Sequence, residues 1–169
     1  ISERKPDLLV VLGDFSDQLD FIKASVNLNI PFFTGHALAD SRLPEWLNKE
    51  QAARVRVLTA YPLLVETENA GNKLHQQILN EYAPHLSANR WTLYGQAVAE
   101  LMVEVLKRAG RSLSRQKAII AAENIKQWQG KLLPPVFLDS RNHLVLSSFR
   151  VSQISPGRVN HLSEWIDGR

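Results

Sequence analysis

Apolar residues occur along the chain in two kinds of pattern, one typical of strands and the other of helices. Three short, nearly continuous apolar runs predict strands over residues 7–12, 30–34 and 56–60. The first run is the kind expected of a strand that is buried on both faces. Between these runs, apolar residues recur at helical spacing at Leu19, Ile22 and Val26, and Pro44 marks a second helix start. The order strand, helix, strand, helix, strand predicts a parallel sheet with right-handed crossovers.

Helical periodicity replaces the short runs after residue 61. The segments 66–82 and 91–109 predict two helices, and Ser114 is expected to cap a third. Gly110 stands where a helix commonly ends. The helix over 91–109 carries a broad apolar stripe of the kind that faces a core. This stripe consists of Tyr94, Val98, Leu101, Met102, Val105 and Leu106. Strand-like patterns then return at 144–154 and 159–166, joined by a turn at 155–157.

Composition excludes several classes of function. The chain has 169 residues, 44% hydrophobic and 22% charged, which is enough for a sizeable core. The 20 Lys+Arg and 17 Asp+Glu are scattered, and no recognition motif favours nucleic-acid binding. The absence of cysteine excludes disulfides, thiolate metal sites and cysteine nucleophiles. No apolar run is long enough to predict a transmembrane helix. Because the chain starts ISERKPDLL without Met, the lack of a signal peptide carries no information about export.

Known catalytic motifs are absent from the sequence. It has no P-loop, no G-x-G-x-x-G after a strand and no G-x-S-x-G. Its histidines show no close-paired spacing, so no metal site is predicted. Asp14 and Asp17 lie three residues apart, where carboxylates complement the dipole at a helix N-terminus. The sequence therefore predicts neither an enzyme nor a cofactor.

Each of the three expected strands is followed by a small residue beside a polar or aromatic one. Because the carboxyl ends of parallel strands meet at one edge, beside free helix N–H groups, a ligand cleft is predicted there. Taken singly, these residues are also explained by tight turns, core filling by Phe15 and Tyr61, and helix capping by Asp14 and Ser16. The candidate ligand-binding residues are Gly13, Asp14, Phe15, Ser16, His36, Ala37 and Tyr61.

Three stretches of the chain resemble one protein family. KPDLLVVLGDFSDQLDFIKASVNLNIPFFTGHAL resembles the second-lobe segment of type I periplasmic solute-binding proteins, the leucine/isoleucine/valine-binding class. AVAELMVEVLKRAG is similar to that family's long helix, and LLPPVFLDSRNHLVLSSFRVSQISPGRVNHLSEWI to its C-terminal portion. The resemblance covers the chain in the right order. It implies an α/β, periplasmic binding protein type I-like fold with a parallel sheet, flanking helices and parts of two lobes.

This resemblance implies a two-lobed clamp that closes on a small solute in an interlobe cleft. The solute would be an amino acid, an amide or a small organic acid, presented to an ABC transporter permease in the periplasm or outside the cell. Residues 1–61 would belong to the second lobe, with Pro62 at a hinge crossing. Residues 62–148 would belong to the first lobe, and 149–169 would return to the second. The family's N-terminal half has no counterpart here, and we expect it in a longer or a separate chain.

One departure from the family concerns the expected partner of a ligand ammonium group. Amino-acid-binding members place an acidic residue where this sequence has Ala37, and alanine cannot form a charge-assisted hydrogen bond. Asp14 is a candidate replacement, whereas a protonated His36 would suit an anion. Two alternatives to a transport role stay open: a ligand-sensing regulatory domain of the same fold, and an α/β enzyme.

Overall fold

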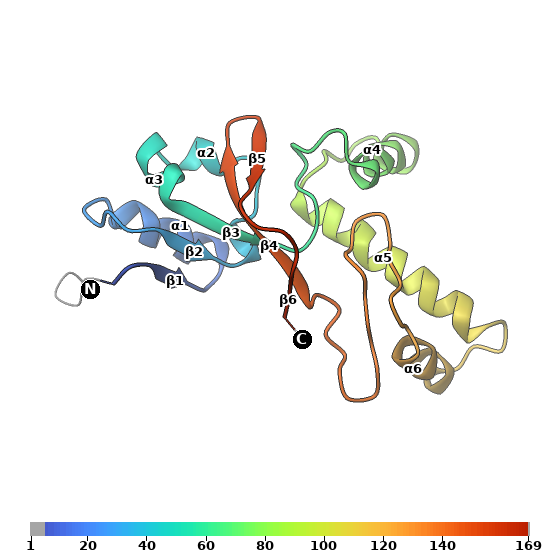
Figure 1. Ribbon diagram of the computed structural model, residues 1–169. Coiled ribbons are helices and arrows are strands. Elements are labelled where there is room, and N and C mark those ends of the chain that lie inside the picture. Colours follow the sequence, from blue (N-terminus) through green and yellow to red (C-terminus); the bar gives the residue numbers. More distant parts are fainter. Residues whose placement is uncertain (1–5, 169) are drawn as a thin grey trace. The chain divides into compact units, whose positions relative to one another are not determined.

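The structure is a computed structural model that describes residues 6–168 (Figure 1). The first five residues of the predicted second-lobe segment therefore lie outside the described residues. The chain divides into two compact units. Unit 1 comprises the chain up to Glu66 together with Phe149–Ile166, and unit 2 comprises Thr67–Ser148 with the residues from Asp167 onward.

Unit 1 is built on a sheet whose first three strands are parallel, as the alternating pattern predicted. Its elements are β1 (Leu9–Val11), α1 (Phe15–Ala24), β2 (Phe32–Thr34), the 3₁₀ turn η1 (His36–Leu38), α2 (Leu43–Trp46), α3 (Lys49–Arg54), β3 (Val55–Thr59), β4 (Ser148–Ser155) and β5 (Arg158–His161). The strand order is β1-β2-β3-β4-β5, with β4 antiparallel to both neighbours (Figure 1). A short strand β6 (Ile166–Asp167) also pairs with β4.

One face of this sheet forms the core of unit 1. Phe32 lies beside Val55 in the parallel register, and both are at most 1% exposed. Val57, two residues along β3, points to the same face and is fully buried. Ile22 of α1 and Leu38 of η1 complete the centre of this apolar cluster. Burial of these side chains is the main force that holds the strands and α1 together.

The first strand is not buried on both faces, which corrects the expectation from its continuous apolar run. Leu9 and Val11 pack against the core, but Val10 is 63% exposed and Leu12 is 74% exposed. β1 lies at one end of the strand order, and alternate residues of a strand point to opposite faces. Within unit 1 only one of those faces is covered at β1, so Val10 and Leu12 stay accessible.

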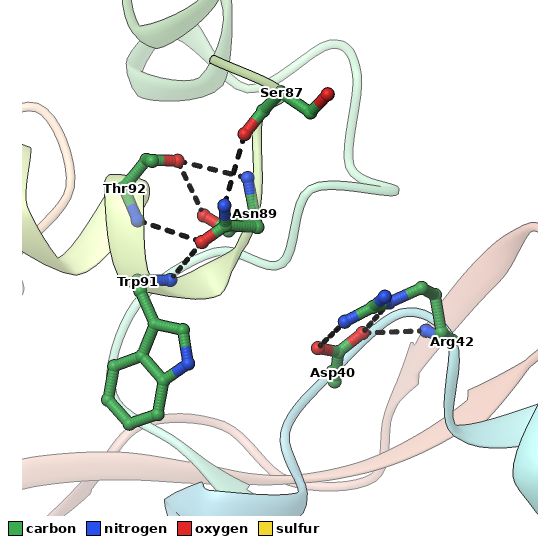
Figure 2. Close-up of polar contacts among 6 residues, drawn as sticks. All are labelled: Asp40, Arg42, Ser87, Asn89, Trp91 and Thr92. Atoms are coloured by element: carbon green, nitrogen blue, oxygen red, sulfur yellow. Dashed lines mark hydrogen bonds and ion pairs between the residues drawn. The ribbon is translucent and has the colours of Figure 1, made fainter.

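Unit 2 consists of three helices and irregular connections. The helices are α4 (Ala70–Tyr82), α5 (Arg90–Ala109) and α6 (Arg115–Glu123), which confirms the three predicted helices. Asn89 caps α5: its side-chain oxygen accepts hydrogen bonds from the N–H groups of Trp91 and Thr92 (Figure 2). The hydroxyl of Thr92 accepts one in return from the N–H of Asn89, which completes a capping box. Gly110 ends the helix with φ 76°, a conformation that favours glycine.

Four of the six residues in the apolar stripe predicted on α5 are exposed, which is a second correction. Among them, Tyr94, Val98 and Met102 are 44%, 46% and 53% exposed, whereas Val105 is buried. The helix also buries Leu93 and Ala97, which lie on an adjacent face. Because α5 carries apolar residues around more than one face, periodicity alone did not identify the face that unit 2 packs.

Candidate functional site

The three segments named as candidate ligand contacts lie at one edge of the unit 1 sheet. β1, β2 and β3 are parallel, so their carboxyl ends share an edge, which we call the carboxyl edge. Residues 13–16 follow β1, residues 35–37 follow β2, and residues 60–61 follow β3. The structure thus brings these segments together, whereas their role in binding stays a prediction.

The first segment turns the chain and caps α1. Gly13 has φ 154°, and its carbonyl accepts a hydrogen bond from Nε2 of Gln18 at 2.6 Å. The Oδ1 atom of Asp14 accepts hydrogen bonds from the N–H of Asp17 at 3.0 Å and from the hydroxyl of Ser16 at 2.9 Å. The Asp17 N–H and, next, the Ser16 hydroxyl lower the pKa of Asp14, because both stabilise the carboxylate. The side chain of Asp14 is therefore already used in a helix cap.

Phe15 serves the core as well as the carboxyl edge. Its half-buried ring meets the ring of Trp46 edge to face, with centroids 4.8 Å apart, and it packs against the core of unit 1. This contact supports the core-filling interpretation of Phe15. Truncating the ring would thus change stability as well as any ligand contact, which makes Phe15 a poor single probe of binding.

His36 and Tyr61 join the ends of β2 and β3. The Nε2 atom of His36 is hydrogen-bonded to the hydroxyl of Tyr61, and the two rings lie 4.4 Å apart at 62°. Tyr61 is only 3% exposed, whereas His36 and the adjacent Ala37 are half-buried. The pair thus links the ends of β2 and β3 at the carboxyl edge.

Sequence reasoning missed a hydrogen-bonded series of side chains within unit 1. The hydroxyl of Ser152 bonds to the hydroxyl of Thr59 at 2.9 Å and to Nδ1 of His161 at 3.0 Å. Nε2 of His161 then meets Glu66 at 3.1 Å. Serine, histidine and glutamate also form catalytic triads, but Ser152 is fully buried, so no substrate reaches its hydroxyl. The series connects β5 and the segment after β3 to the sheet.

Cavities occur away from the carboxyl edge. One of about 580 Å³ in unit 1 lies between Pro44, Lys49 and Ile154, near the start of β3. Another of about 600 Å³ in unit 2 lies among α4, α5 and residues 128–131. Neither cavity is lined by the N-terminus of α1 together with polar groups from several strand ends. The carboxyl edge has both features, and for this reason we place the candidate site there.

A metal-binding cluster and a membrane-spanning helix are both absent from residues 6–168. No cluster of three or more His, Asp or Glu side chains in this part of the chain is arranged to hold a metal ion. None of the helices within the same range combines the length and the apolar character needed to cross a membrane.

No protein-family model and no curated protein sequence matches the chain, but several solved structures do. A branched chain amino acid ABC transporter structure from Thermus thermophilus with bound valine is 14% identical, with a TM-score of 0.73 over 98% of this chain and 47% of that one. An ABC transporter substrate binding protein from Aeropyrum pernix is 12% identical, with a TM-score of 0.79, and the match covers 99% of this chain and 46% of that one. A fatty acid ABC transporter substrate-binding protein from Thermomonospora curvata is 14% identical, with a TM-score of 0.73 over 98% and 44%.

The chain spans less than half the length of these three structures, and almost all of it is matched by each. At such low sequence identity the likeness establishes the fold, in agreement with the α/β class and the parallel strands of unit 1. The chain therefore has the fold of about half of a type I periplasmic solute-binding protein.

Proposed function

We propose that the protein is a solute-binding component of an ABC transporter that captures a small polar solute at the carboxyl edge of unit 1. The observation that carries this proposal is the convergence of three polar or aromatic segments at the ends of three parallel strands. Support comes from the matched structures, which are described as ABC transporter proteins, one with bound valine and one for fatty acids.

In this proposal the two units belong to the two lobes of a clamp. Unit 1 is part of the second lobe and unit 2 part of the first, with the crossing near Pro62. The protein acts outside the cytoplasmic membrane and delivers its solute to a membrane permease. It binds the solute, an amino acid, an amide or a small organic acid, without changing it chemically.

The seven candidate residues have different roles in this proposal. Gly13 lets the chain turn beside the solute, and the N–H groups at the start of α1, next to Asp14 and Ser16, offer hydrogen bonds. His36 offers its half-buried ring to the solute, and Tyr61, itself buried, fixes that ring in place through their hydrogen bond. Phe15 and Ala37 border the same space.

Native mass spectrometry of the purified protein, followed by denaturing mass spectrometry, tests this function. We expect a species heavier than the bare chain by the mass of one small molecule, which is lost on denaturation. Tyr61→Phe should reduce the occupied fraction, and Tyr82→Phe, at an exposed position in unit 2, serves as the matched control. A bare chain under both conditions, with no thermal shift on adding amino acids, amides or organic acids, would contradict the proposal.

A further inference from the structure

Arg150 lies at the carboxyl edge, although the residues around it in the sequence did not indicate a binding site. β4 runs antiparallel to β3, so the beginning of β4 lies beside the end of β3. Arg150 is directly opposite Thr59, and the hydroxyl of Thr59 donates a hydrogen bond to the carbonyl of Arg150 at 3.4 Å. Tyr61 follows Thr59 by two residues. A cationic residue thus lies beside the end of β3, at the carboxyl edge.

The guanidinium of Arg150 has no anionic partner among the residues that the structure describes. It lies over the ring of Trp165, with its central carbon 4.5 Å from the ring centroid. Within residues 6–168, no carboxylate forms an ion pair with it, and its Nε atom is shielded from solvent without an acceptor. By contrast, Arg42 pairs with Asp40 and Arg108 with Glu104. A partly buried cation without a counter-charge is costly, and a bound anion would offset that cost.

The first carboxylate after each of the parallel strands already has partners within the protein. The first carboxylates after β1, β2 and β3 are Asp14, Asp40 and Glu66. Asp14 caps α1, and Asp40 is held by the guanidinium of Arg42 at 3.2 Å (Figure 2). Glu66 accepts the N–H of Leu63 and meets His161. An ammonium group would therefore find each of these three carboxylates already engaged by the protein.

We propose that Arg150 binds the carboxylate of the solute, and that the solute is a monocarboxylate without an ammonium group. This inference rests on the proposed function and names the chemical class of its ligand. The planar guanidinium matches the two carboxylate oxygens, and its stacking on Trp165 holds it in one orientation. Phe15, which is half-buried, would contact the apolar body of the acid.

Isothermal titration calorimetry with three probes of one carbon skeleton tests the inference. Isovalerate has the carboxylate alone, isovaleramide has no charge, and valine adds the ammonium group. For the wild-type protein we expect isovalerate to bind about tenfold or more tightly than either relative, the size of one charged hydrogen-bonded contact. Arg150→Gln should remove that preference, and Arg158→Gln, an exposed arginine of β5 in the same unit, should keep it.

A second variant protects the test against a failure to fold. Arg150→Lys keeps the charge but not the planar fork, so isovalerate should bind more weakly than to the wild type and more tightly than to Arg150→Gln. Circular dichroism confirms that each variant is folded. The inference is overturned if valine or isovaleramide binds as tightly as isovalerate and Arg150→Gln does not change that affinity. The proposed function is unaffected by this outcome. No heat with any probe, together with no co-purified solute, overturns both.

Discussion

Phe32 and Val57 in the sheet of unit 1 are fully buried, whereas Val98 and Met102 on α5 of unit 2 are 46% and 53% exposed. All four residues belong to segments that are apolar in the sequence. In unit 1, α1 and η1 supply the second layer that covers one face of the sheet. In unit 2, the described residues cover Leu93, Ala97 and Val105 of α5 but leave Val98 and Met102 exposed. An apolar pattern therefore indicates which residues need a packing partner, but not whether the same unit provides one.

Each unit contains a hydrogen-bonded series of buried side chains. In unit 2, His75 bonds to Thr92 and to Gln96, each at 2.9 Å. Gln96 donates to Glu100, whose other oxygen accepts the N–H of Lys131. This series links α4, α5 and the segment after α6, as the series through Ser152 links β3, β4 and β5 in unit 1. Both units therefore need satisfied buried hydrogen bonds in addition to apolar burial.

The largest effect is expected in the core of unit 1. Phe32→Ala removes a fully buried ring and should lower the free energy of unfolding by about 3–5 kcal/mol. Urea unfolding, with hydrogen exchange followed in peptides of each unit, measures the loss. Phe33→Ala, at the half-buried neighbouring position of β2, is the control and should cost clearly less. Equal losses for the two variants would contradict the one-sided core.

The next effect tests the polar series of unit 2. His75→Leu removes the hydrogen-bond partner of the buried Gln96 side-chain oxygen and the contact with the Thr92 hydroxyl, so we expect a loss of about 1–3 kcal/mol. The loss should appear in hydrogen exchange of α4 and α5. His85→Leu changes an exposed histidine and should stay within about 0.5 kcal/mol. If both variants behave alike, the buried series does not stabilise unit 2.

A smaller effect is expected at the N-terminus of α5. Asn89→Ala removes the cap drawn in Figure 2 and should cost about 1 kcal/mol. Asn89→Asp keeps a capping oxygen and should retain most of the stability. Thermal unfolding followed by circular dichroism compares the two. A full loss with aspartate would show that the amide, and not the capping oxygen, is what matters.

The smallest effect concerns the exposed face of α5. Met102→Lys replaces a 53% exposed apolar side chain by another good helix former, so stability should change by less than about 0.5 kcal/mol. Val105→Lys, at an 8% exposed position one turn away, should be strongly destabilising. The comparison is read from urea unfolding of both variants. Comparable destabilisation by Met102→Lys would mean that this face is covered.

The candidate site was predictable only where it follows the strands in the chain. The segments 13–16 and 35–37 could be assigned to one edge because strands of a parallel sheet end together. Arg150 could not, because its position depends on β4 pairing with β3 across most of the sequence. The bond between Thr59 and Ser152 joins residues 93 positions apart, and no local motif records it.

By itself the sequence determined the alternating strands and helices, the cap at Ser114 and the helix end at Gly110. These features depend on interactions within a few residues, so local spacing and residue type are sufficient to find them. Only the tertiary structure decided which faces of β1 and α5 are buried, and that β4 places Arg150 at the carboxyl edge. Both outcomes depend on layers and strand pairs contributed by distant segments, because an apolar or charged residue carries no record of its partner.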